Sequence, residues 1–262
     1  MRTDDQSDGA RRYRIQSVDR ALAALDTIGA AGAGGIGLSE LARALGSSKS
    51  SALSLVRTLA ERDFVAQVDG GRYRLGLALA RLGDLALSQI TLYDVAMPVL
   101  RRLTDATGRT ARVGVFDDGY AIVIGRVDGP GSIRIESHLG RRELPHCSAL
   151  GKAILSQLPD DAVRAVALRT GLPARTANTI TDVDALLREL ARVRERGFAI
   201  DDEEDSAGVF CVGAPVRDHR GECVGAISVS GVKVALGDGF GRLPQIVAEH
   251  AAQISSSLGA AV

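Results

Sequence analysis

The stretch LSELARALGSSKSSALSLVRTLAERDFV (residues 38–65) contains the local signals that decide the fold of the first part of the chain. Apolar residues before Gly46 repeat at three- and four-residue spacing, which predicts a short amphipathic helix that Gly46 ends. Ser47 or Ser48 can cap a second helix that follows at once. The gap between the two helices is therefore too short for a domain linker and has the length of a helix-turn-helix turn.

The flanking segments extend this unit to a winged helix-turn-helix over residues 14–75. An amphipathic helix capped by Ser17 is predicted before it, and GAAGAGGIG (29–37) ends that helix. FVAQVDGGRYRL (64–75) reads as two short strands around a glycine-rich turn, which forms the wing. A small helical subdomain that binds protein is the alternative interpretation.

The third helix, which is predicted to end at about Arg62, has two distinct faces. At 100° per residue, its apolar residues, including Ala52 and Val56, lie on the packing face, and its polar residues lie opposite. The opposite face and the turn before it would meet the bases and phosphates of double-stranded DNA, and basic residues of the wing would support them. The predicted DNA-binding residues are Ser48, Lys49, Ser50, Ser51, Ser54, Arg57, Arg72 and Arg74.

The segment GLALARLGDLALSQI (76–90) is apolar on more than one face of a helix. Such a helix usually packs against a partner, so we predict a linker and dimerisation helix over residues 76–93. A helix that is buried within its own domain is the alternative.

Residues 94–262 follow a different pattern, with strands and helices in mixed order. ARVGVF and YAIVIGRV flank Asp117-Asp118-Gly119, which is a hairpin signal, and SIRIESH (132–138) reads as another strand. FAIDDEE, GVFCVGAPV and CVGAISVSG are three further strands, and helices are predicted before, between and after them. The pattern predicts an α+β domain with an antiparallel sheet, of the kind that senses small molecules.

Composition and charge limit the class of protein. Residues 11–81 carry 11 Lys and Arg against 6 Asp and Glu, whereas residues 82–262 carry 20 against 23, so the basic first part is the part expected to meet a polyanion. The chain has only 3 Cys without CxxC spacing, and it has no run of apolar residues long enough for a membrane span. We expect a cytoplasmic protein without a metal, another cofactor or a membrane partner, and we expect residues 1–13 to be a disordered tail.

Several stretches in this order resemble the IclR family (isocitrate lyase regulator type) of bacterial transcription regulators. They are SVDRALAALDTI, LSELARALGSSKSSALSLVRTLAERDFV, GGRYRLGLALARLG, LPHCSALGKAIL, NTITDVDALLRELARVRERGFAIDDEEDSAGVFCVGAPV and GAISVSG. The match covers roughly residues 14–256. The resemblance implies a winged helix, a linker helix and a GAF-like C-terminal domain that binds a small carboxylate or aromatic acid. It also implies a homodimer or a pair of dimers that controls catabolic operons, with no enzymatic activity.

The same resemblance implies which residues of the C-terminal domain line the effector site. The start of the helix after LPHCS would offer backbone N–H groups to an anion, and strand residues would add a carboxylate, a thiol and two hydroxyls. The implied effector-binding residues are Ala149, Leu150, Gly151, Asp201, Cys211, Ser228 and Ser230.

Three features leave alternatives open. Relatives usually place His or Tyr and then Arg where this chain has Leu53 and Ser54, so it reads a different operator or has become a sensor module that no longer reads specific DNA. His146 beside Cys147 would suit a hydrolase or transferase, but adjacent residues seldom reach attack geometry. The acidic run 201–205 reads as a solvated loop because it lacks the spacing of a calcium-binding loop.

Overall fold

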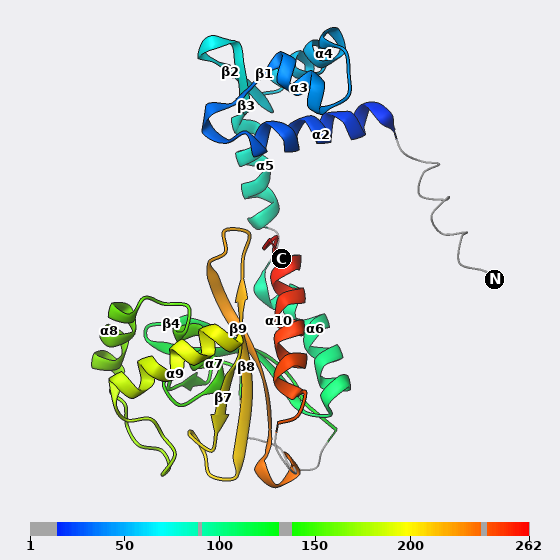
Figure 1. The fold of residues 1–262 in the computed structure, drawn as a ribbon. Helices are drawn as coiled ribbons and strands as arrows, with labels where there is room; N and C mark the ends of the chain where they lie inside the picture. Colours follow the sequence, from blue (N-terminus) through cyan, green and yellow to red (C-terminus); the bar gives the residue numbers. More distant parts are fainter. Residues whose placement is uncertain (1–14, 89–90, 131–137, 237–239, 262) are drawn as a thin grey trace, which may run out of the picture. The chain divides into compact units, whose positions relative to one another are not determined.

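The computed structural model describes residues 15–88, 91–130, 138–236 and 240–261 (Figure 1). The chain divides into two compact units, Met1–Gln89 and Ile90–Val262. The predicted N-terminal tail lies outside the described residues, and so does the predicted strand SIRIESH apart from His138. No helix in the described ranges is long and apolar enough to cross a membrane.

The first unit is a winged helix-turn-helix, as the sequence predicts. Its strands form one antiparallel sheet in the order β1-β3-β2. The strand β1 was not predicted, because two residues carry no recognisable alternation of apolar and polar side chains. The elements are α2 (Gln16–Ala30), η1 (Gly32–Gly34), β1 (Ile36–Gly37), α3 (Leu38–Ala44), α4 (Lys49–Ala60), β2 (Val65–Val68), η2 (Asp69–Gly71), β3 (Arg72–Leu75) and α5 (Leu77–Ser88).

The start of α2 corrects one prediction. The helix begins at Gln16 after Ile15, and no side chain caps it, so Ser17 lies inside the first turn and is not the cap. Of the two predicted caps of α4, Ser47 and Ser48, the structure has Ser48 as the N-cap residue. Gly46 adopts the left-handed conformation (φ 56°) that ends α3 and turns the chain toward α4.

A small apolar core holds these helices to the wing. Its buried members come from α2, α3, α4, β2 and β3, and Leu53 of α4 packs against it as a partly buried side chain. The core residues are Ala24, Ile28, Leu41, Val56, Val65 and Tyr73. Because Tyr73 points inward, Arg72 and Arg74 on either side of it point away from the core.

The second unit is built on a six-stranded antiparallel sheet in the order β6-β5-β4-β9-β8-β7. The two-residue strand β6 is another element that sequence analysis missed. The elements are α6 (Leu92–Thr107), β4 (Thr110–Asp117), β5 (Tyr120–Val127), β6 (Arg142–Glu143), α7 (Ala149–Leu155), α8 (Asp160–Thr170), α9 (Val183–Arg196), β7 (Ala199–Asp202), β8 (Val209–Arg217), β9 (Cys223–Val232), η3 (Lys233–Leu236) and α10 (Leu243–Ser257).

Helices cover both faces of this sheet (Figure 1). On one face, α6 and α10 pack against apolar strand residues such as Val113 and Val229. On the other face, α7 and α9 pack against a smaller cluster that includes Ala121 and Ala199. Successive residues of a strand point to opposite faces of the sheet. The residues that alternate with those packed against α6 and α10 therefore lie on the face that α7 covers.

Candidate functional site

The N-terminus of α4 is held by a cluster of serine hydroxyls. Ser48 Oγ accepts a hydrogen bond from the backbone N–H of Ser51 at 3.2 Å. The hydroxyls of Ser50 and Ser51 both lie 2.9 Å from Ser48 Oγ. These bonds satisfy an otherwise unpaired N–H group and fix the first turn of the helix.

The outward face of α4 is polar and exposed, as predicted. Lys49, Ser50, Ser54 and Arg57 are all exposed, whereas the opposite face supplies buried core residues. Leu53 does not join the outward face, because it packs against the core of the domain. Among the described residues, the outward face of α4 therefore presents hydroxyl and cationic groups and no large apolar group.

The two wing arginines differ in what they contact. Arg72 donates from Nε to the carbonyl of Gly34 at 2.9 Å and from Nη2 to the carbonyl of Gly35 at 2.8 Å. Its Nη2 also lies 3.4 Å from Glu40 Oε2. Arg72 thus ties the wing to the loop before α3, whereas Arg74 is exposed on the same strand.

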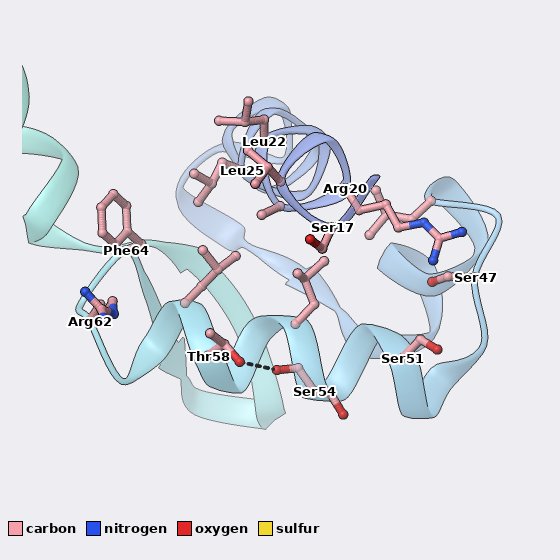
Figure 2. A pocket seen from close by; sticks show the side chains of 15 residues that line it. Ser17, Arg20, Leu22, Leu25, Ser47, Ser51, Ser54, Thr58, Arg62 and Phe64 are labelled. Atoms are coloured by element: carbon pink, nitrogen blue, oxygen red, sulfur yellow. Dashed lines mark hydrogen bonds between the residues drawn. The ribbon is translucent and has the colours of Figure 1, made fainter. Parts of the chain in front are cut away.

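An apolar groove runs between α2 and α4 in the first unit (Figure 2). Its volume is about 710 Å³, and it is lined by Leu22 and Leu25 of α2 and by Ser54 and Thr58 of α4. The groove was not predicted from the sequence. Leu22 is 56% exposed, so this side of α2 presents an uncovered apolar surface in the single chain.

In the second unit, the strand register gathers the predicted effector residues into one row beneath α7. Asp201 of β7 lies opposite Cys211 of β8, and Cys211 lies opposite Ser230 of β9. Ser228 is two residues from Ser230 and therefore shares its face. Cys211 Sγ lies 3.3 Å from Ser230 Oγ, and all four side chains are buried.

The first turn of α7 supplies the rest of the predicted site. Ala149, Leu150 and Gly151 are fully or nearly fully buried, and Leu150 belongs to the cluster between α7 and the sheet. The backbone N–H of Gly151 already donates to Ser148 Oγ at 3.1 Å. In this structure the N–H caps α7, and the effector-binding role that the resemblance implies for Ala149, Leu150 and Gly151 stays a prediction.

Two buried charged residues, Arg112 and Glu143, complete the row, and neither was predicted as a site residue from the sequence. Arg112 of β4 lies opposite Ser228, and its Nη1 donates to Glu143 Oε1 of β6 at 2.6 Å. Its Nη2 donates to Cys211 Sγ at 3.6 Å. Both charged side chains are only 5% exposed. We call Asp201, Cys211, Ser228, Ser230, Arg112 and Glu143 the polar row.

The acidic run 201–205, which begins within β7, is a folded element, and this corrects the prediction of a solvated loop. Asp201 is 2% exposed, and its Oδ1 accepts the backbone N–H of Glu204 at 2.8 Å. Glu204 forms an ion pair with Lys152 of α7, whose side chain is completely buried and also donates to the carbonyl of Ile200. The run therefore anchors α7 to the end of β7.

Burial changes the protonation of these acids. It raises the pKa of Asp201 to about 7, with a further contribution from the negative charge of Glu204. Burial also raises the pKa of Glu204, although the Lys152 ammonium opposes the change. Asp201 therefore exchanges its proton near neutral pH, so it is able to accept or donate a hydrogen bond in the polar row.

Two family models match the chain, one over each domain, and together they decide its family. Residues 17–69 match the model of the IclR helix-turn-helix domain, and residues 84–256 match that of the C-terminal domain of IclR bacterial transcriptional regulators. The chain belongs to the IclR family. It is accordingly a DNA-binding transcription regulator with a C-terminal effector-binding domain.

Relatives and solved structures agree with this membership over nearly the whole chain. The transcriptional repressor AllR of Escherichia coli is 30% identical over 256 residues, which cover 97% of this chain and 94% of AllR. The regulator XynR of the same species is 32% identical over 82% of this chain and 86% of its own length. The crystal structure of the Agobacterium tumefaciens repressor BlcR superposes with a TM-score of 0.79 at 27% identity, covering 95% of this chain and 99% of that one.

The chemistry near His146 and Cys147 gives no support to a nucleophile in this IclR-family protein. Burial raises the pKa of the Cys147 thiol, and the carboxylates of Asp205 and Asp201 raise it further. A thiol nucleophile needs the opposite shift. His146 Nε2 lies 3.2 Å from the carbonyl of Pro173, while burial lowers the pKa of its ring.

Proposed function

We propose that this IclR-family regulator reads its operator with α4 and changes its DNA affinity when a small metabolite binds the polar row. The observation that carries the proposal is the pairing, in one chain, of an exposed cationic face on α4 with a buried row of polar groups under α7. The first has the composition of a DNA-reading surface, and the second has that of a small-molecule site.

The DNA contacts would divide between phosphates and bases. Lys49 and the serines at the start of α4 would meet phosphates, because a helix N-terminus and a cation both favour negative charge. Ser50, Ser54 and Arg57 would reach base edges in the major groove, and Arg57 has the geometry to recognise guanine. In the wing, Arg74 would contact the backbone directly and Arg72 would mainly hold the wing in place.

We also propose that the protein acts as a homodimer, or as a pair of dimers, through α5. Leu77 is 84% exposed, Leu82 is 46% exposed and Leu85 is 52% exposed, and at helical spacing these residues occupy one side of the helix. Exposed leucines in a row usually mark a surface that a partner covers. A dimer would place two copies of α4 on two half-sites of an operator.

The effector would be a small carboxylate or aromatic acid, and the regulated genes would belong to a catabolic operon. Its binding would change the relative placement of the two winged helices in the dimer. Coupling of this kind is typically about 1–3 kcal/mol, which corresponds to roughly 5- to 150-fold in DNA affinity.

The test is fluorescence anisotropy of the full-length protein on the DNA upstream of its own gene, at two salt concentrations, against a scrambled duplex. Substitution R57A should weaken specific binding about 10- to 100-fold, because an arginine–guanine contact contributes about 1–3 kcal/mol. The control is R20A, which removes the same charge from an exposed position on α2. Unchanged affinity of R57A would reject the assigned face, and binding that is insensitive to salt would favour a sensor module that no longer reads DNA.

A further inference from the structure

Three buried polar atoms of the polar row have no hydrogen-bond partner among the described residues. They are Arg112 Nε, Glu143 Oε2 and Ser228 Oγ. They come from three different strands, but Arg112 lies opposite Ser228 in the sheet and is bonded to Glu143. The three side chains are therefore neighbours, and we call them the Arg112–Glu143 patch.

The unpartnered atoms define the chemistry that would complete the patch. A guanidinium Nε–H can only donate, an ionised carboxylate oxygen can only accept, and the serine hydroxyl can do either. A group that satisfies them must offer an acceptor to Arg112 beside a donor to Glu143. Leaving these atoms unpaired in a buried place costs free energy, so a ligand that pairs them gains affinity.

The charges of the patch already balance. The Arg112 guanidinium and the Glu143 carboxylate form an ion pair at 2.6 Å, and both are buried. Arg141, whose Nε lies 3.9 Å from Glu143 Oε1, is balanced in turn by Asp205, whose Oδ2 lies 3.2 Å from Arg141 Nη2. A second carboxylate at this place would add an uncompensated charge and would point its oxygens at Glu143 Oε2. The patch therefore favours an uncharged group over an anion.

We propose that Arg112 and Glu143 determine effector specificity by recognising an uncharged group in which an acceptor stands beside a donor, as in a carboxamide. This inference rests on the proposed effector role of the polar row. It concerns the chemical group that the row binds at its β4–β6 end. The remainder of the effector lies along the row toward Ser230 and Asp201.

Two small molecules of almost equal shape distinguish recognition of a carboxamide from a general affinity for carboxylic acids. Oxamate carries one carboxylate and one carboxamide, whereas oxalate carries two carboxylates. Isothermal titration of the full-length protein should show oxamate binding at least about tenfold more tightly than oxalate, because a site built around a donor–acceptor pair rejects the analogue that cannot complete it. The same order should appear in the concentration of each probe that changes DNA affinity.

Substitution E143Q supplies a readout that a merely structural role would not give. The glutamine amide can donate to a carboxylate and removes the repelling charge, so the preference for oxamate should disappear or reverse. The control E189Q removes a carboxylate from α9 that pairs with Arg192 and Arg196 and lies outside the polar row, so it should retain the wild-type ratio. Substitution R112K keeps the positive charge but loses Nε, and should lower the affinity for oxamate more than that for oxalate.

The outcomes separate this inference from the proposed function. Equal affinity for the two probes, binding of neither, or an unchanged ratio in both E143Q and R112K would overturn the inference. DNA affinity without any probe is measured for every variant. A wild-type protein that does not bind its upstream DNA would count against the proposed function, whereas retained DNA binding with no probe preference would reject the specificity role alone.

Discussion

The protonation of Asp201 makes a prediction about stability that can be worked from the structure. The carboxyl group is 2% exposed and lies near Glu204, Lys152, Cys211 and Arg112, and its pKa rises from the ordinary 3.8 to about 7. Substitution D201N keeps an oxygen that can accept the backbone N–H of Glu204 at the same place, but it removes the titration.

The sign follows from counting protons in the two states. Below pH 3.8, Asp201 is protonated in both the folded and the unfolded chain. Between that pH and about 7, the folded chain holds a proton that the unfolded chain has lost, so stability falls as the pH rises. Above pH 7 both states have lost the proton, and the free energy of unfolding falls no further. A pKa change of this size lowers the free energy of unfolding by roughly 4 kcal/mol as an upper limit.

The assay is urea unfolding of wild type and D201N followed by far-ultraviolet circular dichroism between pH 5 and pH 8.5. We expect D201N to be more stable than wild type at pH 8, by up to about 4 kcal/mol, and the difference to shrink as the pH falls toward 5. Because Glu204 also titrates, the difference between the two proteins at each pH is the quantity to compare. A D201N variant that is less stable at pH 8, or a difference that does not change with pH, would refute the reasoning.

Further predictions concern stability and are measured by the same unfolding assay. Substitution S48A should cost about 1 kcal/mol, because it removes the cap of α4; a loss no larger than that of an exposed serine elsewhere would contradict the capping role. Substitution K152M should destabilise by about 3–5 kcal/mol, because it leaves Glu204 buried without its cation, and adding E204Q should recover part of the loss. Substitution G151A should destabilise markedly, because a Cβ there would lie 2.2 Å from Pro145 Cα; a tolerated alanine would show that the contact is not rigid.

Local sequence signals predicted the first unit well because its elements are decided by near neighbours. The cap of α4 depends on Ser48 and Ser51, three residues apart, and the helix-turn-helix turn depends on Gly46. The hairpin after β4 depends on Asp118 and Gly119, which both have positive φ. The start of α2 was misassigned, because Ser17 is a good capping residue but the helix begins at Gln16, and the two-residue strand β1 was not predicted.

The sequence alone determined the family, the helix-turn-helix, the α+β class of the second domain and the strand positions of Asp201, Cys211, Ser228 and Ser230. These follow from periodicity, turn residues and an ordered set of motifs, which act over short stretches of chain.

Only the tertiary structure decided how the charges are used. The partners Arg112 and Glu143 lie 31 residues apart, and Lys152 and Glu204 lie 52 apart, so no local pattern connects them. The sheet order brings Arg112 close to Glu143, and the packing of α7 against β7 brings Lys152 close to Glu204. Both pairs are buried, where a charge is tolerated only with its partner. Long-range packing also pairs Glu204 of the acidic run with Lys152 of α7. In the first unit, it places Arg72 in hydrogen bonds with the loop before α3.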